Sequence, residues 1–409
     1  MTDGSAASET LAARCCIAGG GPAGMMLGLL LARAGVDVIV LEKHADFFRD
    51  FRGDTIHPST LEVVHELGLL EEFLKRPHQE LRELRGWIGD EMIPVADFSH
   101  LPTHCKFIAL MPQWDFLDFL AQHGKTYPSF RLRMQAEVTE LIEEGGRVAG
   151  VRARTPGGAL EVRADLVVGA DGRHSTVREK AALQIMDLGA PMDVLWMRLS
   201  QRLGDPKESM GRFDPGHVFV MIDRGDYWQC AFVIPKGGFD EVKRRGLEAF
   251  RDEVARVAPF MRDRVSEIAD WGHVKLLTVA VDRLRQWCRP GLLCIGDAAH
   301  AMSPIGGTGI NLAIQDAVAA GNILAEPLRR GPATLDQLWA VQRRRELPTR
   351  ITQRAQVLIQ NRIIGRVLTT QAKSFSVPLP VRLMRRWPFL RRIPARLIGL
   401  GVRPEHVKS

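Results

Sequence analysis

Glycines and an acid near the start of the chain have the types and spacing that hold a dinucleotide. Gly19, Gly21 and Gly24 follow one apolar run, and a second apolar run ends at Glu42. In such a turn the first glycine permits a tight bend, the second lets backbone N–H groups approach a pyrophosphate, and the third lets helix and strand pack closely. Glu42 can accept a hydrogen bond from an unphosphorylated ribose. The motif therefore predicts NAD or the ADP half of FAD, and disfavours NADP at this position.

Two later clusters carry the same kind of chemistry. Asp171 and Gly172 follow one apolar run, and Gly296 and Asp297 follow another. The next segment contains Pro304, Gly307, Gly309 and Asn311. Asp297 can accept hydrogen bonds from sugar-chain hydroxyls, and the glycine-rich approach to a helix offers backbone donors to an electron-accepting heterocycle. A flavin needs this second set of contacts and a nicotinamide does not, so the sequence favours FAD.

Buried strands must position these clusters. Apolar runs end just before Gly19, at Glu42, at Gly169 and just before Gly296, and each is expected to be a buried strand of one sheet. A carboxylate at the carboxyl end of a parallel strand lies in the crevice where such sheets bind ligands. The clusters are therefore expected to share one binding crevice.

Helices and a second sheet account for most of the remaining chain. Amphipathic spacing predicts helices over 57–76 and 113–124, and a long helix is expected after Gly309. From about residue 193 to 281, β-like runs flank a helical stretch. This pattern is typical of a mostly antiparallel sheet that could cover a substrate.

Composition indicates an ordinary globular protein. The chain has 409 residues, of which 45% are hydrophobic and 25% charged, enough for about two domains. Its six cysteines show no CxxC pair and no metal-ligand spacing, so buried reduced thiols are expected and a metal site is not. The first 14 residues lack the basic and apolar regions of a signal peptide, and no apolar run is long enough to cross a bilayer. A cytoplasmic location is expected.

The net charge of +7 is concentrated near the end of the chain. Between Arg382 and Arg396 there are six arginines and no acid, interleaved with apolar residues such as Trp387. This segment either contacts a membrane surface or an acidic partner, or packs its apolar stripe on its own protein. The second interpretation is favoured, and Pro388 and Pro394 break any long helix. Nucleic-acid binding is not expected, because no binding motif accompanies the charge.

The ordered motifs resemble those of the FAD-dependent aromatic hydroxylases, the class A flavoprotein monooxygenases with the p-hydroxybenzoate hydroxylase fold. The resemblance runs from about residue 14 to 355 and adds an arginine segment around Arg52 and a helix-start glutamine at Gln113. It implies a set of FAD-binding residues: Gly19, Gly21, Pro22, Ala23, Gly24, Glu42, Lys43, Arg52, Gln113, Val138, Asp171, Gly172, Gly296, Asp297, Pro304, Gly307, Thr308, Gly309, Ile310 and Asn311.

The resemblance implies a single-component, FAD-dependent oxidoreductase. In that family NADPH or NADH acts as a transient reductant, and O2 then supplies one oxygen atom, through a flavin C4a-hydroperoxide, to an aromatic, phenolic or polycyclic small molecule. The flavin carries the difficult step, so no side chain is predicted to be catalytic, although the Pro304 loop is expected beside the flavin. The chain has no second GxGxxG unit after residue 43, as in relatives that lack a separate nicotinamide domain. Both a monomer and a homodimer are open.

The expected fold is α/β, with a Rossmann-like FAD-binding domain of the glutathione-reductase type, a mostly antiparallel β substrate domain and a C-terminal helical tail. The FAD-binding domain is expected to be discontinuous, over residues 14–75, 105–185 and 285–355. The substrate-binding sheet is expected to take residues 76–104 and 186–284, and the basic tail residues 356–409.

Substrate-contacting residues are the least constrained by the sequence. Met197, Phe219 and Trp228 lie on expected strands of the second sheet and are candidates for lining an apolar pocket. The alternative is that they face the ordinary core, because every second residue of such a strand points away from the pocket.

Three histidines and three other functions are further alternatives. His57, His217 and His300 are candidates for assisting deprotonation of a phenol, against a structural role for each.

A halogenase is disfavoured, because those relatives carry a WxWxIP strand and "YWQCAFVIP" has one tryptophan with different spacing. A flavin-dependent reductase and a non-catalytic module that binds flavin and an aromatic ligand also remain open.

Overall fold

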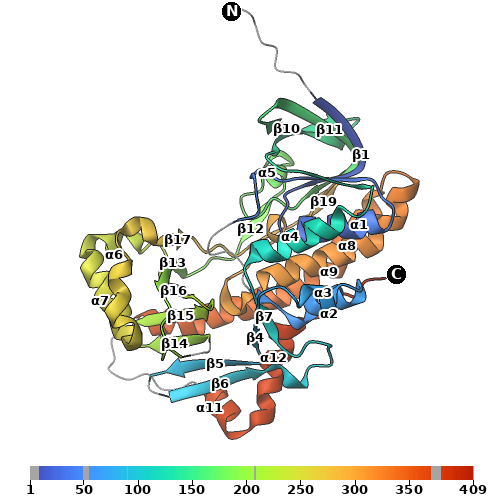
Figure 1. Ribbon diagram of the computed structural model, residues 1–409. Helices are drawn as coiled ribbons and strands as arrows, with labels where there is room; N and C mark the ends of the chain where they lie inside the picture. The colour runs from blue at the N-terminus through green and yellow to red at the C-terminus, as the bar shows by residue number, and fades with distance from the viewer. Residues whose placement is uncertain (1–8, 49–54, 90, 207–208, 370–378, 409) are drawn as a thin grey trace, which may run out of the picture.

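Two β-sheets joined by long helices form the frame of the protein (Figure 1). The computed structural model describes residues 9–48, 55–89, 91–206, 209–369 and 379–408. The first sheet contains β19 (Cys288–Arg289), β20 (Leu292–Cys294), β11 (Gly158–Gly169), β1 (Glu9–Ala18), β2 (Val38–Leu41) and β8 (Phe130–Arg133) in spatial order, with β10 (Arg147–Thr155) and β9 (Glu137–Glu144) extending from β11.

The centre of the first sheet is parallel. β20, β11, β1, β2 and β8 run in one direction, and β2 is buried along its whole length. Continuous apolar strands of this kind need both faces covered. In Figure 1, α1 (Pro22–Arg33), α4 (Gln113–Gly124) and α8 (Gly309–Arg330) lie together as one layer on this part of the sheet.

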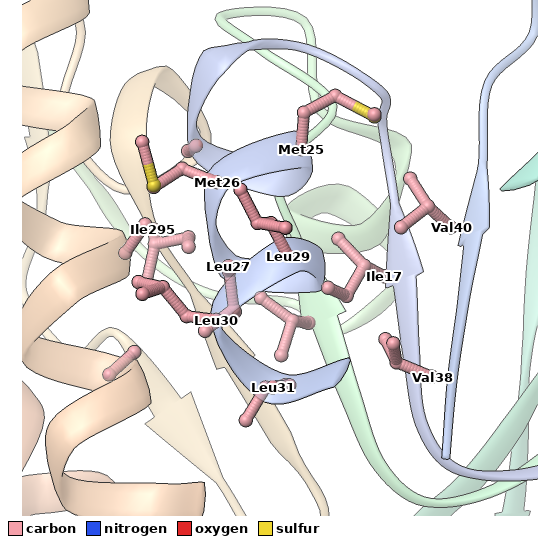
Figure 2. Close-up of a cluster of buried hydrophobic side chains, with 14 of the residues drawn as sticks. Ile17, Met25, Met26, Leu27, Leu29, Leu30, Leu31, Val38, Val40 and Ile295 are labelled. Carbon is pink, nitrogen blue, oxygen red and sulfur yellow. The ribbon is translucent and has the colours of Figure 1, made fainter. Parts of the chain in front are cut away.

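The core of this half lies between α1 and the sheet. Figure 2 shows Leu29 and Leu30 of α1 in one cluster with Ile17 and Ile295, the last residue following β20. Each of these four side chains is at least nine-tenths buried. Burial of such a side chain contributes about 1.5–3 kcal/mol, so this cluster anchors α1 and the turn before it.

The second sheet is mostly antiparallel, as predicted. Its strands in spatial order are β17 (Lys275–Leu277), β13 (Met192–Ser200), β16 (Tyr227–Pro235), β15 (His217–Asp223), β14 (Met210–Asp214), β5 (Glu83–Ile88) and β6 (Glu91–Asp97). Only the pairing of β14 with β5 is parallel among these described strands. In Figure 1, α6 (Phe239–Arg245) and α7 (Leu247–Val257) lie along the outer side of this sheet.

Smaller elements join the two sheets. They are β3 (Thr55–Ile56), α2 (Pro58–Glu66), α3 (Leu70–Phe73), β4 (Gln79–Leu81), β7 (Ile108–Leu110), α5 (Thr176–Lys180), β12 (Ile185–Asp187) and β18 (Asp282–Leu284). The sequence predicted a single helix over 57–76, whereas the structure has α2 and α3 separated by a turn at Gly68, whose φ is +75°. The boundaries of the predicted domains remain a prediction.

The C-terminal part is helical and packs back on the body. It contains α9 (Leu335–Ile359), a π-helical segment (Gln360–Ile364), α10 (Gly365–Thr369), α11 (Leu379–Arg386) and α12 (Arg392–Gly399). Ala395 and Leu400 are buried in one cluster with Phe98 and Leu110, so one side of the tail does cover its own protein. None of the described helices is long and apolar enough to cross a membrane.

Candidate functional site

The carboxyl ends of four parallel strands meet at one edge of the first sheet. Ala18 of β1 pairs with Leu41 of β2 on one side and with Gly169 of β11 on the other, and Gly169 pairs with Cys294 of β20. The backbone N–H of Gly19 donates to the Leu41 carbonyl at 2.8 Å, which continues the ladder into the turn. The loops carrying the predicted FAD-binding motifs therefore start side by side.

Backbone geometry explains the first glycine motif. Gly19 has φ of +105°, and a Cβ there would meet the Ala170 backbone. A Cβ on Gly24 would collide with the Gly19 carbonyl oxygen, so this glycine lets α1 pack against the turn. A Cβ on Gly21, by contrast, would have no atom within 4 Å. The space in front of Gly21 is thus open on the side from which a phosphate would approach.

The N-terminus of α1 offers donors to that space. Pro22 is the first residue of the helix, Gly21 is its N-cap, no side chain caps it and its first turn has no acid. The unpaired N–H groups at such a terminus and the helix dipole favour an anion. Ala23 lies next to Gly296, since a Cβ on Gly296 would lie 3.1 Å from the Ala23 Cβ. The pyrophosphate turn and the Gly296 turn are therefore packed together.

Glu42 lies over the same turn. Its Oε2 accepts from the backbone N–H of Gly20 at 2.9 Å, and its Oε1 accepts from the N–H of His44 at 3.1 Å. These bonds fix the carboxylate at the end of β2, where the sequence predicts the ribose. Lys43 is exposed beside it, and Val138 lies nearly buried on β9 opposite Ala153.

Asp171 is a half-buried carboxylate with one buried oxygen that lacks a partner among the described residues. Its Oδ2 accepts from the Val177 N–H at 3.1 Å, whereas its Oδ1 is buried without a hydrogen-bond partner among the described residues. Burial raises the pKa of Asp171, against the opposing hydrogen bonds from Ser175 and the Val177 N–H. Gly172, with φ of +84°, turns the chain after it. A buried acceptor without a partner fits a cofactor hydroxyl or a bound nucleotide at this position.

A buried ionic network holds the Gly296–Asp297 turn. The Gly296 N–H donates to Oδ2 of Asp316, at 3.1 Å. The same carboxylate pairs with Nε2 of His300, at 2.6 Å, and with Nε of Arg345, at 3.0 Å. Although burial opposes ionisation, these two partners hold the pKa of Asp316 below its usual range. The network therefore fixes the backbone from which Asp297 projects.

The segment from Pro304 to Gly309 bends sharply before α8. Gly306 and Gly307 have φ of +76° and +61°, and a Cβ on Gly307 would collide with the Thr55 side chain. Thr308 is the N-cap of α8, no side chain caps this helix, and its first turn, which includes Ile310, has no acid. The second long helix thus also presents free N–H groups, suited to carbonyl oxygens of a heterocycle.

Asn311 was predicted to bind the flavin, but the structure gives its side chain another role. Its Oδ1 accepts from the His57 N–H at 2.9 Å and from the Thr60 hydroxyl at 2.7 Å. Its Nδ2 donates to the carbonyls of Thr55, at 3.2 Å, and Gly307, at 3.3 Å. Both amide atoms are engaged by the protein, so the Asn311 side chain ties β3 to the loop, and a flavin contact through its backbone in the first turn of α8 stays a prediction.

Two other predicted cofactor residues are less defined. Arg52 lies outside the described residues. Gln113 is the first residue of α4 and is partly buried. Their assignment to FAD therefore remains a prediction from the resemblance.

The three substrate candidates on the second sheet are core residues. Met197, Phe219 and Trp228 are completely buried in one cluster with residues of α7 such as Phe250 and Val254. This cluster fills the outer side of the sheet. The prediction that these side chains line the substrate pocket is therefore wrong, because strand alternation directs them away from the segment from Pro304 to Gly309, called the flavin loop below.

The other face of the second sheet points toward the flavin loop. Val194, Val218 and Ala231 form a cluster there that Ile305 of the loop also joins. Trp196, on the same face of β13, is partly buried against it. These side chains are buried as well, since Ile364 and Val367 pack on the same face. This face of the sheet therefore packs toward the loop that the resemblance places beside the flavin.

A large cavity lies between β4, the start of β5 and the loops at the ends of the strands of the second sheet, and its described lining contains none of the apolar residues just named. Its volume is about 940 Å³, and its lining includes Leu81, Leu110, Gln201 and Asp223. Leu110 pairs directly with Thr55, whose hydroxyl donates to the Gly307 carbonyl at 2.9 Å. One wall of the cavity is therefore a neighbour of the flavin loop.

The three candidate histidines have structural roles. His57 is fully buried, its Nδ1–H donates to the Ile398 carbonyl at 2.7 Å, and burial lowers its pKa to about 4. His300 is paired with Asp316 inside the network. His217 contacts Arg256 of α7, on the outer side of the second sheet. The structural alternative therefore holds for all three.

Comparison with known proteins adds the decisive observation. Residues 12–355 match the family model described as FAD binding domain. The chain is also 34% identical, over 403 residues, to 6-methylpretetramide 4-monooxygenase of Streptomyces rimosus, covering 96% of this chain and 94% of that relative. The chain belongs to the FAD-dependent aromatic hydroxylases. It is an FAD-dependent monooxygenase, as the motifs predicted.

Two further comparisons agree with this assignment. The monooxygenase is 26% identical to para-nitrophenol 4-monooxygenase of Pseudomonas sp. strain WBC-3, over 80% of this chain and 82% of that protein. Among solved structures it resembles OxyS, the anhydrotetracycline hydroxylase of Streptomyces rimosus, with a TM-score of 0.75 and 25% identity, over 98% of this chain and 78% of OxyS. The predicted α/β fold class is confirmed.

Sequence reasoning missed the residues that support the loops from behind. Asp316 and Arg345 fix the Gly296 turn, and Gln356 of α9 donates to the Ser303 and Ile305 carbonyls at 3.1 and 3.0 Å. A signal was present, because polar residues recur at helical spacing on one side of the two long helices. Their partners are far away in sequence, however, and no motif points to them.

Proposed function

We propose that this monooxygenase hydroxylates a fused polycyclic phenol related to the tetracycline skeleton. The observation that carries the proposal is the similarity to 6-methylpretetramide 4-monooxygenase, which extends over nearly the full length of both chains. The cavity of about 940 Å³ is large enough for a multi-ring compound, and its lining, which includes Arg82, Glu83 and Arg202, offers partners to the polar groups of such a compound. The apolar face of the second sheet suits the rings of such a substrate.

FAD is the cofactor whose groups these residues fit. Gly21 and the N-terminus of α1 would receive the pyrophosphate, and Glu42 the adenosine ribose. Asp171, through its unpartnered Oδ1, and Asp297 would accept from sugar or ribityl hydroxyls, and the N-terminus of α8 would face the heterocycle. When bound and reduced by NADPH or NADH, FAD supplies the O2 chemistry of hydroxylation.

The protein's own contribution is positioning and exclusion of water. Ile305 and the apolar residues of the second sheet cover the side of the loop where the substrate is proposed to bind. Such a dry site limits unproductive release of H2O2 and strengthens the hydrogen bonds that orient the substrate. His57, whose pKa is about 4, stays neutral at pH 7 and adds no charge near the loop.

Turnover of defined compounds tests the substrate class. The FAD-loaded protein would be given NADPH or NADH and O2 with 6-methylpretetramide, anhydrotetracycline or p-nitrophenol, while H2O2 is counted. We expect a polycyclic compound to accelerate oxidation of the reductant, to gain one oxygen atom derived from labelled O2, and to release little H2O2. Productive hydroxylation of p-nitrophenol alone would contradict the proposed substrate class. Reduction without oxygen incorporation would instead support a flavin-dependent reductase.

We also propose that the outer side of the tail contacts anionic lipid surfaces. Trp387, Phe389, Ile393 and Leu397 are 48–60% exposed next to arginines of the same segment. Amphipathic segments of this composition bind at the interface of acidic membranes. Sedimentation with phosphatidylserine-containing vesicles, compared with phosphatidylcholine vesicles, tests this, and Trp387→Ser is expected to weaken binding. Equal binding to both kinds of vesicle, or to neither, would contradict it. The proposal is consistent with the expected cytoplasmic location, which would place the tail beside an acidic membrane leaflet.

A further inference from the structure

A row of residues runs along one side of α9 and its continuation. Gln353, Gln356, Gln360, Ile364 and Val367 follow at intervals of three or four residues and are all buried. This spacing places them on one helical face. Their contacts show which parts of the protein this face spans.

The first two glutamines hold the backbone on either side of the flavin loop. Gln353 donates to the carbonyls of Asp282 and Ala301, at 2.6 and 3.0 Å. Gln356 accepts from the Ser303 N–H and donates to the Ser303 and Ile305 carbonyls and to the Thr308 hydroxyl. The amides of Gln353 and Gln356 are therefore both paired with other groups of this chain.

The last two residues of the row contact the second sheet. Ile364 and Val367 belong to the same cluster as Val194 and Val218, on the face directed at the flavin loop. The carbonyl of Val367 accepts from the Gly216 N–H at 2.8 Å, which fixes α10 against β15. The row thus passes from the flavin loop to the proposed substrate side of the sheet.

Gln360 lies between these two sets and has no partner of its own. Its side chain is completely buried, and neither Oε1 nor Nε2 has a hydrogen-bond partner within the described part of the chain. Buried amides are almost always paired, so an amide with both polar atoms unpaired calls for an explanation, and pairing with a bound group is one. Gln360 also begins a π-helical segment, a feature found frequently at functional sites.

We propose that the Gln360 amide hydrogen-bonds the substrate and sets which edge of its ring system faces the flavin. An amide both donates and accepts, so it complements a phenol hydroxyl or a neighbouring hydroxyl and carbonyl pair. A site built to make such a bond discriminates strongly against analogues that lack the group. The inference rests on the proposed function and deepens it, because it assigns the polar contact that an apolar pocket needs for orientation.

Gln360→Leu, which keeps the size but removes both polar atoms, tests the proposal in the FAD-loaded enzyme. With anhydrotetracycline or 6-methylpretetramide we expect KM to rise about 10-fold, equivalent to about 1.4 kcal/mol. We expect unchanged affinity for FAD, an unchanged flavin absorption spectrum, and a Tm of the substrate-free protein that is equal or higher, because an unpaired buried amide has been removed. Gln360→Glu is expected to restore part of the affinity for substrates that offer a hydroxyl.

Gln356→Leu is the matched control, one turn earlier on the same face. It should lower Tm and weaken FAD binding, because it removes bonds to the loop. A lowered Tm or an unchanged KM in Gln360→Leu would overturn the proposal. So would a loss of FAD affinity without a change in KM, which would assign the amide to the flavin.

The proposed function and the role of Gln360 have separate readouts. If the wild-type enzyme binds these polycyclic compounds without oxygenating them, the proposed function fails, and the ratio of variant to wild-type Kd then tests Gln360 in place of KM. If the wild-type enzyme binds none of them, both proposals are overturned.

Discussion

The two sheets of this protein differ in what positions their functional residues: backbone geometry at the first sheet, and the facing of side chains on the second. At the edge of the first sheet, the residues around the cofactor site are glycines and strand-end carboxylates whose positions follow from backbone geometry: Gly19 needs its positive φ and Gly24 its missing side chain. On the second sheet, the face on which a side chain lies decides whether it belongs to the core under α7 or points toward the flavin loop. Met197 is core, whereas its neighbour Trp196 faces the flavin loop. Motifs thus predict the cofactor site, whereas strand alternation and packing decide which side chains of the second sheet are core.

The largest effect is expected at Asp316, whose carboxylate holds the Gly296 turn at the edge of the first sheet. This prediction tests whether the first sheet depends on side chains that are distant in sequence. Asp316→Asn leaves Arg345 and His300 without their carboxylate in a fully buried site. Loss of one partner of a buried ion pair costs about 3–5 kcal/mol, so we expect a matching drop in the free energy of unfolding and weaker FAD binding. Urea denaturation and FAD titration measure both. Glu326→Gln, which affects only exposed ion pairs on the same helix, is the control, and equal effects of the two changes would contradict the prediction.

A pair of tryptophans tests the two faces of the second sheet. Trp228→Ala removes a fully buried ring and is expected to lower the free energy of unfolding by about 3–5 kcal/mol while leaving the KM for substrate unchanged. Trp196→Ala, on the opposite face, is expected to cost less stability but to raise KM. Thermal unfolding and steady-state kinetics with a polycyclic phenol give both readouts. The assignment of faces is wrong if Trp228→Ala raises KM more than Trp196→Ala does.

The pH dependence of stability tests how tightly the tail covers His57. Because burial lowers its pKa from 6.5 to about 4, the unfolded chain takes up a proton first as the pH falls. The free energy of unfolding should therefore decrease between pH 6.5 and pH 4, by about 3 kcal/mol from this group. His57→Asn, which can keep a donor for the Ile398 carbonyl, should flatten that part of the profile. His273→Asn, at an exposed histidine, should not, and equal profiles for all three proteins would refute the prediction.

The smallest expected effect separates two glycines of one motif. Gly24→Ala places a Cβ against the Gly19 carbonyl oxygen, so we expect a loss of about 1–3 kcal/mol in the free energy of unfolding. Gly21→Ala meets nothing within 4 Å, so the FAD-free protein should keep its stability while its affinity for FAD falls. Unfolding of the FAD-free protein and FAD titration distinguish the two. Similar stabilities for both variants would break the distinction between a packing glycine and a ligand-facing one.

Much of the fold could be predicted because its signals are local. Apolar runs ending at Gly19, Glu42, Gly169 and Gly296 identified the central strands, and the motif order identified the family. The substrate candidates failed for a physical reason: Met197 and Trp196 are adjacent on one strand and equally apolar, and only the packing of α7 decides which of them is core. The hydrogen bonds of the Asn311 side chain could not be predicted either, since its partners His57 and Thr60 are about 250 residues away.

By itself, the sequence determined that this chain binds a dinucleotide of the FAD type. Glycine spacing and strand-end carboxylates act through backbone geometry, which is set within a few residues of each motif. Tertiary structure alone decided which face of the second sheet meets the flavin loop, and that α9 braces that loop. These features depend on side chains that meet from distant parts of the chain, and their pairing is fixed only when the two sheets and the long helices pack together.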